Sequence, residues 1–598
     1  MEAFKIQIAG KLSKVLGQTV QPFELETPPD RTMGDFAFPC FKLSKIERKA
    51  PPVIAKELAD KVAPLIPTDQ YTVKAVGPYV NFSLTDASVI QSILVPVLKS
   101  QTQFGSVASK SRDRWVFEFS SPNVAKPFQI YHLRTTIVGA SLSKIAKHRG
   151  FDVITINHLG DWGTQYGKLA IALKKYESTL PKELTLKNLV DVYVQIHKDI
   201  DAEKAAFTAS NPDAPAESAI EKAGQDSFLK LEQGDPEMRA IWLRCLEISL
   251  KEFKNTYARY QVDFDHYWGE SHYESQLKPL LEKLKSEHIV KLDQGAWVVP
   301  VTSRAGHELP PCILEKSDGA SIYATRDVAA AVYRYEQFKF DRMSYVVGKE
   351  QMMHFEQIFG VLRAMGCEWE KACEHIATGL YRFKDAKMST RKGNFITLEE
   401  VSELCVAKSL ALMLERNNQM ESGNEQKLSE QELTLIAEQV AIGALVFADL
   451  STDPSRDMEF DVERVISFDG ETGPYLQYAH TRCASIIRKS GVALSEFTNL
   501  DPALLEKNLK KQEELFLLKQ LGRFPEALER TLDQRKPSQL TSYLIDLTKD
   551  FGVFYRECKV VNPENPELTK ARLALVEAAR IVLSLGLDLL GIPKPAKM

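Results

Sequence analysis

The chain has 598 residues, of which 44% are hydrophobic and 26% are charged, and its formal net charge is −4. This length is too great for one hydrophobic core and favours about three to five domains. No apolar run predicts a membrane span, and the small negative charge gives no overall attraction to a polyanion. We therefore expect a soluble, cytoplasmic protein with no membrane partner.

The cysteines and the first residues argue against two further classes of protein. The eight cysteines are scattered and contain no C-x-x-C pair, so neither a disulfide framework nor a zinc site is expected. The start of the chain has an acidic second residue and no long apolar segment, so no targeting sequence is expected. We predict reduced structural thiols and no metal site built by the protein.

Residues 1–110 are predicted to form the first domain. This region contains an alanine-rich helical stretch and a strand at 79–84, and a polar linker at 105–111 closes it. A small α/β interaction domain is one interpretation of these residues, and a resemblance described below gives another; the sequence alone favours neither strongly.

Residues 111–410 are predicted to form the second domain, which opens with a strand, a tight loop and a helix. Aromatic and branched residues favour the strand at 115–119, and apolar residues at helical spacing favour the helix at 132–148. Pro122 and Pro127 stiffen the loop between them. The start of such a helix offers unpaired N–H groups and a positive dipole end, which suit phosphates.

A second strand is predicted at 151–157, and a glycine-containing segment from His158 to Gln165 follows it. Ligands collect at such strand ends in doubly wound sheets. Residues at about 180–310 have a mostly charged, helical pattern and are predicted to interrupt the sheet. The sheet resumes at 343–348, and a helix begins near Gln351.

A compact basic loop at 387–394 carries Lys387, Arg391 and Lys392. Arginine can grip phosphate oxygens at two points and lysine supplies a mobile charge, so the loop suits phosphate groups; a solvated basic turn is the alternative. Residues 411–598 have Leu and Ala at three- and four-residue spacings. This pattern predicts a third, all-α domain.

The order of these segments resembles that of the class I aminoacyl-tRNA synthetases, and within them the arginyl-tRNA synthetases. The first signature of that family runs S-x-N-x-A-K-x-x-H-x-G-H-L-R-S/T, and this chain matches it at Ser121, Asn123, Ala125, Lys126, His132, Leu133 and Arg134. Gln129 replaces the first signature histidine, and Tyr131 replaces the glycine. The segments at 158–165 and 387–394 resemble a further wall of the nucleotide pocket and the K-M-S-K-S signature.

The resemblance implies an α/β fold with a Rossmann-type class I synthetase catalytic domain that carries an insertion at about 180–310. It also implies an N-terminal additional domain that contacts the tRNA elbow and a C-terminal helix-bundle domain that binds the anticodon. The implied reaction is ATP-dependent activation of L-arginine, with Mg²⁺ present as MgATP, followed by transfer to tRNA-Arg. A monomer is expected.

The resemblance implies two overlapping sets of residues around ATP. The catalytic set is Lys126, His132, Lys387, Ser389 and Arg391, of which Lys126, His132, Lys387 and Arg391 would neutralise developing phosphate charge. The ATP-binding set is Lys126, Gln129, Tyr131, His132, Gly160, Asp161, Trp162, Lys387, Met388, Ser389 and Lys392.

Specificity for arginine is expected to depend on carboxylates, because a buried guanidinium needs anionic partners. Asp327 lies four residues after Tyr323, which places both on one face if the segment is helical. An ion pair of Asp327 with Arg326 or Arg334, and a surface position for Glu270, are the alternatives. The implied arginine-binding set is Glu118, Ser121, Asn123, Glu270, Tyr323, Asp327 and Gln351.

Aromatic side chains and arginine suit the stacking of unpaired RNA bases. The resemblance therefore implies a tRNA-binding set of Tyr79, Asn81, Phe82, Tyr475, Tyr478, Arg482, Tyr555 and Met598. Simple packing between helices is the alternative for Tyr475 and Tyr478, and for Tyr478 the two interpretations have equal weight.

Two other functions stay open from the sequence. Gln129 and Tyr131 motivate a synthetase-derived tRNA-binding protein in which activation is lost or reduced. A different adenylyl-transferring enzyme on the same sheet is the second, although it would not need the C-terminal helical and aromatic module.

Overall fold

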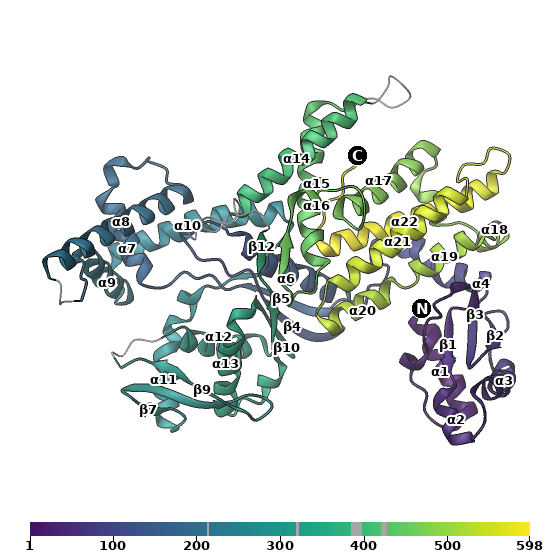
Figure 1. Ribbon diagram of the computed structural model, residues 1–598, viewed down its shortest axis with the longest axis horizontal. Coiled ribbons are helices and arrows are strands. Elements are labelled where there is room, and N and C mark those ends of the chain that lie inside the picture. Colours follow the sequence, from purple (N-terminus) through teal and green to yellow (C-terminus); the bar gives the residue numbers. More distant parts are fainter. Residues whose placement is uncertain (212–214, 318–321, 384–396, 420–426) are drawn as a thin grey trace.

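The computed structural model describes residues 1–598 except 212–214, 318–321, 384–396 and 420–426. Its N-terminal part is a three-stranded antiparallel sheet in the order β1-β3-β2, with helices packed beside it (Figure 1). Its elements are α1 (Glu2–Leu16), β1 (Phe36–Pro39), α2 (Phe41–Glu47), α3 (Pro51–Val62), β2 (Tyr71–Val76), β3 (Tyr79–Leu84), α4 (Asp86–Val89) and α5 (Val95–Ser100).

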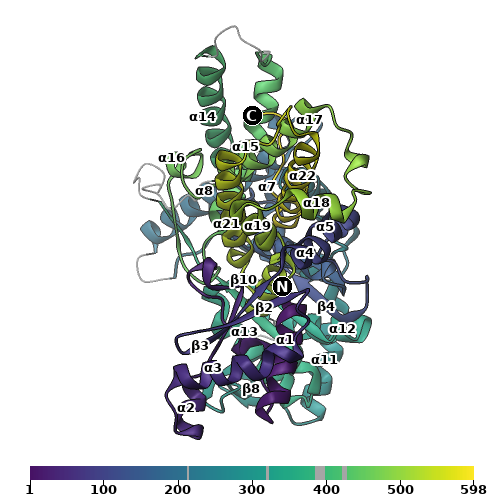
Figure 2. The same ribbon diagram turned by 90° about the vertical axis from the view of Figure 1, so that its right-hand side faces the viewer.

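This N-terminal part packs on the C-terminal helices, as Figure 2 shows from the side where the N-terminus faces the viewer. The amino group of Met1 donates to the carbonyl oxygen of Gly522 at 3.0 Å. The guanidinium of Arg31 lies 2.7 Å from the carboxylate of Asp550. The two ends of the chain therefore form one continuous body on one side of the central sheet.

The central sheet has five parallel strands in the order β11-β10-β4-β5-β6. The chain enters in the middle at β4, moves outward to β5 and β6, and later returns to β10 on the other side of β4. This arrangement creates a topological switch point at the carboxyl ends of β4 and β10, where α/β proteins bind ligands. The strands are β4 (Arg112–Glu118), β5 (Phe151–Asn157), β6 (His266–Tyr267), β10 (Arg342–Gly348) and β11 (Cys373–Thr378).

Side chains of β4 alternate between two cores, as a strand covered on both faces requires. Trp115 and Phe117 enter the core that contains α6 (Ile130–His148), whereas Val116 enters the core that contains α12 (Tyr323–Phe338) and α13 (Met352–Ala364). Gly139 allows α6 to approach closely, because a Cβ there would lie 2.2 Å from the ring of Phe119. The strand, loop and helix predicted at 115–148 are confirmed.

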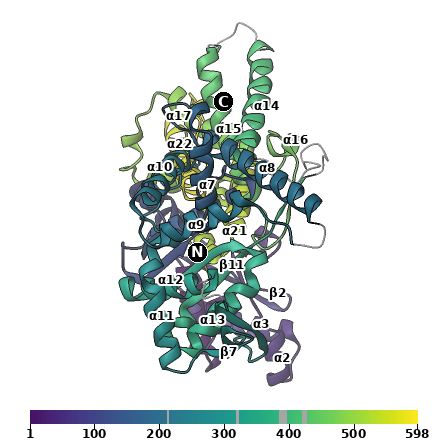
Figure 3. The ribbon, with the colours of Figure 1, turned by 90° about the vertical axis from the view of Figure 1, so that its left-hand side faces the viewer.

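The insertion is only partly the helical segment that its sequence predicts. Helices α7 (Thr164–Lys175), α8 (Leu186–Ser210), α9 (Ala219–Glu232) and α10 (Pro236–Arg259) stand beside the sheet and lie in front in Figure 3. After α11 (Glu274–Ser286) comes a small antiparallel sheet of β7 (Lys291–Asp293), β8 (Ala296–Thr302) and β9 (Glu308–Glu315). The helical prediction was wrong for these strands, of which β8 packs Val299 and Val301 into the core that contains α13.

The C-terminal region is helical, with one exception. A short parallel pair joins β12 (Tyr381–Phe383), which precedes this region, to β13 (Met458–Phe460), a strand inside the region 411–598 that the sequence predicted to be all helix. The helices are α14 (Leu398–Gln419), α15 (Glu430–Leu450), α16 (Val462–Val465), α17 (Gly473–Ser490), α18 (Pro502–Asn508), α19 (Gln512–Leu521), α20 (Phe524–Gln534), α21 (Ser538–Glu557) and α22 (Pro566–Leu590).

Within the described ranges, α15 is the one helix that is long and apolar enough to cross a membrane by those two criteria. Of its most apolar window, 72% is buried inside the protein. The apolar surface of α15 is therefore covered by other helices, as in the core helix of a bundle.

Candidate active site

The loop after β4 holds three non-glycine residues in the left-handed region, namely Ser120 (φ 77°), Ser121 (φ 52°) and Ala125 (φ 60°). The hydroxyl of Ser120 lies 2.8 Å from the hydroxyls of both Tyr257 and Thr136. Such strain persists only where surrounding contacts fix it, and it concentrates at functional sites. The loop is thus clamped between α6 and α10 at the switch point of the sheet.

Two residues expected at the site, Asn123 and Gly160, lie side by side. They form a parallel bridge between the two loops, and the amide N–H of Gly160 donates to the carbonyl oxygen of Pro122 at 3.1 Å. A Cβ at position 160 would lie 2.3 Å from Oδ1 of Asn123, so only glycine fits. The buried Oγ of Ser121 has no hydrogen-bond partner among the described residues and stays available to a ligand.

His132 differs from its expected role. Its Nδ1 accepts a hydrogen bond from the backbone N–H of Gln129 at 3.1 Å, and burial together with the nearby charge of Lys126 lowers its pKa to about 3. A neutral ring of this kind can donate a hydrogen bond from Nε2 to a phosphate oxygen, whereas burial opposes the positive charge that the expected role requires. The ring of Tyr131 lies against it, with centroids 4.3 Å apart, and is 38% exposed.

Asp161 forms hydrogen bonds with the segment that carries Glu270. Its carboxylate accepts hydrogen bonds from the backbone N–H and hydroxyl of Ser271 at 2.9 and 2.6 Å. A Cβ at Gly269 would lie 2.4 Å from the same carboxylate. Asp161 thus positions Glu270 through Ser271. The same hydrogen bonds account for the burial of Asp161, with no need for a contact between Asp161 and a nucleotide.

Glu270 is a buried carboxylate in which one oxygen can still accept a hydrogen bond. It is 9% exposed, and its Oε2 has no hydrogen-bond partner in the described part of the chain. Burial raises its pKa to about 7, against the opposing charges of His158 and Arg326. A buried, unpaired carboxylate oxygen is costly unless a cation meets it, so the surface-acid alternative for Glu270 is wrong.

Asp327 lies on the helix that the Tyr323–Asp327 spacing predicts, because α12 begins at Tyr323. Its carboxylate lies 2.5 Å from Nε2 of His354 and 3.6 Å from Nε2 of His158. Burial alone would raise its pKa, but the hydrogen bonds from these histidines lower it well below its usual range. Asp327 is therefore an anion, and among the described residues its partners are histidines rather than the arginines that the alternative named.

Arg334, one of the two arginines considered as partners of Asp327, forms its ion pair with Glu118 instead. Arg334 is 1% exposed, forms an ion pair with Glu118 and donates from Nε to the hydroxyl of Tyr273 at 3.0 Å. Glu118 therefore already has a cationic partner. Arg334, Tyr273, His158 and His354 were not predicted as site residues, although Arg334 lies seven residues after Asp327, on the same face of α12.

Trp162, expected to bind ATP, lies outside the open part of the pocket. It is 8% exposed, and its ring centroid is 5.7 Å from those of both Trp242 and Phe228. It fills the junction between the loop after β5 and the insertion helices. Tyr323, by contrast, is 60% exposed at the start of α12, and Gln351 precedes the first residue of α13.

Lys387, Met388, Ser389, Arg391 and Lys392 lie outside the described residues. The chain that follows them contacts the first signature: the N–H of Leu398 donates to the carbonyl oxygen of Phe128 at 2.9 Å, and Thr397 bridges Gln129. Lys126 is exposed nearby. These contacts place residues 397–398 beside the start of α6.

The expected tRNA residues divide by exposure. Phe82 is 0% exposed in the core of the N-terminal sheet and cannot stack on a base, so that prediction was wrong; Asn81 is 4% exposed and donates to the carbonyl oxygen of Met33. Tyr79 stays partly exposed beside the exposed ring of Phe41, with centroids 5.5 Å apart. Phe41 is a residue that the sequence did not suggest.

On the C-terminal helices, Arg482 lies over two aromatic rings. Its guanidinium carbon is 4.2 Å from the ring centroid of Tyr555 and 5.7 Å from that of Tyr478, which is 41% exposed. Tyr475 is partly buried against the core, and Met598 packs on the pair formed by α14 and α15. Exposure therefore favours RNA contact over internal packing for Tyr478.

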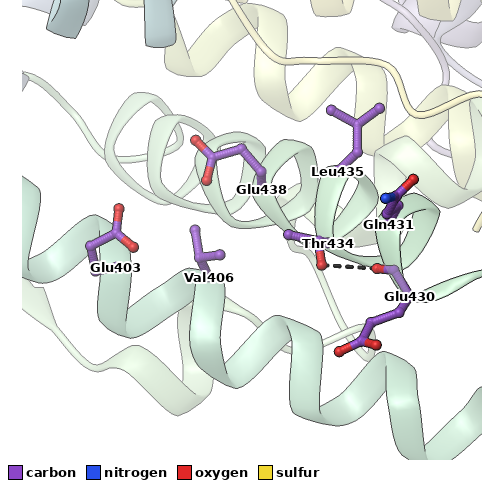
Figure 4. Close-up of a pocket in the computed structure, with 7 residues that line it drawn as sticks. All are labelled: Glu403, Val406, Glu430, Gln431, Thr434, Leu435 and Glu438. Atoms are coloured by element: carbon purple, nitrogen blue, oxygen red, sulfur yellow. Dashed lines mark hydrogen bonds between the residues drawn. The ribbon is translucent and has the colours of Figure 1, made fainter.

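A cavity of about 690 Å³ lies away from these residues, between α14 and α15 (Figure 4). Its lining includes Glu403, Glu430 and Glu438, and Arg259 is already paired with the first and last of these. An acidic lining repels phosphate, so this cavity is unsuited to ATP despite its volume.

A family model described as "tRNA synthetases class I (R), catalytic domain" matches residues 92–462, so the body built on the parallel sheet is that of a class I aminoacyl-tRNA synthetase. The models "Arginyl tRNA synthetase N terminal domain" and "DALR anticodon binding domain" match residues 2–84 and 476–598. The chain belongs to the arginyl-tRNA synthetase family and is an arginine–tRNA ligase, an enzyme that uses ATP.

Relatives over the full length support this assignment. The arginine–tRNA ligase of Clostridium perfringens is 40% identical over 96% of each chain, and that of Clostridium acetobutylicum is 38% identical over 98% of this chain and 99% of the relative. The expectation of a synthetase-derived protein without activation receives no support from them.

Solved structures confirm the fold. The arginyl-tRNA synthetase of Plasmodium falciparum aligns with a TM-score of 0.79 at 23% identity, covering 100% of this chain and 98% of that one. The Thermus thermophilus enzyme aligns with a TM-score of 0.77 at 24% identity, covering 100% and 99%. The predicted fold class, with its catalytic sheet, N-terminal domain and helical C-terminal domain, is confirmed.

Proposed function

We propose that Asp327 and Glu270 select the guanidinium of L-arginine at the carboxyl ends of the sheet. The single observation that carries this proposal is the buried Oε2 of Glu270, which lacks a hydrogen-bond partner among the described residues. Burial raises the pKa of Glu270, and the negative charge of Asp327 lies near enough to raise it further. Two carboxylates facing a delocalised cation match its several N–H donors. Tyr323 begins the same helix four residues before Asp327 and is exposed, so its ring is accessible to a bound arginine.

The amino-acid carboxylate would then face the first-signature loop. Ser121 and Asn123 orient the main-chain end of arginine, and Gln351 approaches from the start of α13. A carboxylate oxygen of arginine attacks the α-phosphorus of ATP, the bond between the α-phosphorus and the bridging oxygen breaks, and pyrophosphate leaves. Mg²⁺ enters as part of the MgATP substrate.

Phosphate charge would be met by groups of different kinds. Lys126 supplies a mobile cation, His132 donates a neutral hydrogen bond, and the N-terminus of α6 contributes its dipole. Lys387, Ser389 and Arg391 of the basic loop would complete this set. Gln129 and Tyr131 adjoin His132 and are compatible with a pocket wall for ATP.

In the second step, the 2′-hydroxyl of the terminal adenosine of tRNA-Arg attacks the carbonyl carbon of arginyl-adenylate, and AMP leaves. We propose that residues 1–110 contact the tRNA elbow and that the C-terminal helices bind the anticodon, as the names of the matched domain models suggest. The catalytic match runs to residue 462, so we assign α14 and α15 to the catalytic body rather than to the region that begins at 411. A cytoplasmic monomer fits this function.

Arginine-dependent exchange of labelled pyrophosphate into ATP tests the activation step. We expect exchange with arginine, measured with and without tRNA-Arg, and none with lysine or citrulline. Exchange that depends equally on another amino acid, in either condition, would contradict the proposed pocket.

Glu270→Gln is expected to raise the KM for arginine and to flatten its pH dependence. Burial raises the pKa of Glu270 to about 7, so Glu270 gains its charge as pH rises and the wild-type KM should fall between pH 6 and 8, by up to about tenfold per unit below the pKa. Asp161, Asp327, His158 and Arg326 face the same carboxylate, so the difference between wild type and variant isolates Glu270.

A folding control accompanies the Glu270 measurement. Because the folded pKa lies above the unfolded value, the ionised carboxylate destabilises the fold at pH 8, and the Gln variant should melt no lower than wild type. Identical pH profiles for the two proteins would exclude Glu270 from the arginine pocket.

Arg482→Ala is expected to weaken tRNA-Arg binding by about 5- to 50-fold, because a stacked arginine and its charge are both lost. The KM for arginine should not change, since Arg482 lies on α17, away from the pocket. Arg488→Ala, an arginine of the same helix, provides the matched charge control. Filter binding at fixed salt measures the effect, and equal losses in the two variants would show that Arg482 contributes only general charge.

A further inference from the structure

The Asp327 carboxylate is held between two histidines from different elements. Nε2 of His354, on α13, lies 2.5 Å from Oδ2, and Nε2 of His158, beyond β5, lies 3.6 Å from Oδ1. Each ring therefore lies against a different oxygen of the same carboxylate.

His158 is fixed on its far side as well. Its Nδ1 lies 3.1 Å from both Nη2 of Arg334 and the carbonyl oxygen of Trp268, so it accepts from Arg334 when unprotonated or donates to Trp268 when protonated. Arg334 is itself anchored by its ion pair with Glu118, and both residues of that pair are buried. Rotation of the Asp327 carboxylate would thus break a contact with one of two rings, of which at least His158 is held firmly.

Burial would lower the pKa of both histidines, but their hydrogen bonds to Asp327 raise it. This agrees with the geometry, because both rings direct Nε2 towards the carboxylate. A carboxylate has about four lone-pair sites, so after one contact to each oxygen a site on each oxygen remains.

The remaining acceptor pattern fits one kind of cation. Two parallel N–H donors of a guanidinium can meet both oxygens at once, whereas a single ammonium group meets them one at a time. We propose that His354 and His158 are positioning residues that set the plane of the Asp327 carboxylate and so select the forked guanidinium of arginine over the ammonium of lysine. This inference rests on the proposed role of Asp327 as the guanidinium acceptor.

His354→Ala is expected to raise the KM for arginine roughly 10- to 100-fold, as for loss of a hydrogen bond to a charged group. In aminoacylation of tRNA-Arg by the full chain, kcat and the KM for ATP should not change, and the preference for arginine over lysine should narrow. His354→Gln, whose side-chain amide can donate from the position of Nε2, should restore most of the affinity. His307→Ala, an exposed histidine between β8 and β9, is the matched control.

The other outcomes separate the inference from the function on which it rests. If His354→Ala raises the KM for arginine and ATP equally and Gln gives no rescue, the role is structural and the inference fails. If Asp327→Asn weakens arginine binding while His354→Ala does not, the inference alone fails. If neither change affects arginine binding, the proposed role of Asp327 is wrong, and the inference falls with it.

Discussion

Asp327→Asn is expected to raise the KM for arginine about 100- to 1000-fold while the KM for ATP stays unchanged, because removing one charge from a buried ion pair costs about 3–4 kcal/mol. The substitution keeps the shape of the side chain and one carbonyl oxygen, but it removes the charge that two histidines hold in place. Steady-state aminoacylation with arginine and ATP varied separately measures the effect.

Asp226→Asn is the control for this measurement, since Asp226 is an exposed aspartate on α9. Circular dichroism of both variants should match that of wild type. Equal loss of affinity for arginine and ATP in Asp327→Asn, with the fold intact, would contradict the assignment of Asp327 to the guanidinium.

Arg134→Met is expected to destabilise the protein by about 3–5 kcal/mol, because it leaves a buried carboxylate without its cation. Nε of Arg134, in the first-signature helix α6, lies 3.7 Å from Oδ1 of Asp449 on α15, and both side chains are 1% exposed. Asp449 also accepts a hydrogen bond from the hydroxyl of Tyr381 on β12. The buried pair therefore joins α6 to α15, and the hydrogen bond from Tyr381 adds β12 to the same contact.

A double-mutant cycle tests the pair. Asp449→Asn alone leaves the Arg134 cation buried, whereas Arg134→Met with Asp449→Asn removes both charges and should recover at least about 1 kcal/mol of the summed loss. Urea unfolding followed by fluorescence and circular dichroism shows whether the transition is two-state and allows the comparison. Additive losses in the double variant would show that the pair carries no coupling.

The sequence predicted those parts of the site that local pattern determines. The strand at 115–119, the helix after it and the shared face of Tyr323 and Asp327 all follow from periodicity, and the structure confirms them. The strands at 291–315 and β13 were missed because strands this short are stabilised by packing on their partners, here α13 and β12, rather than by their own sequence pattern.

Long-range contacts account for the remaining differences at the site. Pairing of Glu118 with Arg334, and of Asp327 with His158 and His354, joins segments far apart in the chain, and no local pattern specifies such partners. The same holds for the burial of Phe82 and Trp162 and for the neutral state of His132. In each case the environment of the side chain, rather than its type, decides its role.

Charging of total tRNA with labelled arginine, followed by sequencing of the tRNAs that carry the label, tests the central claim most directly. The account predicts that label enters tRNA-Arg alone, that it requires ATP, and that Asp327→Asn at low arginine abolishes it. Tight binding of tRNA-Arg by the wild-type chain without any charging at saturating arginine and ATP would contradict the account.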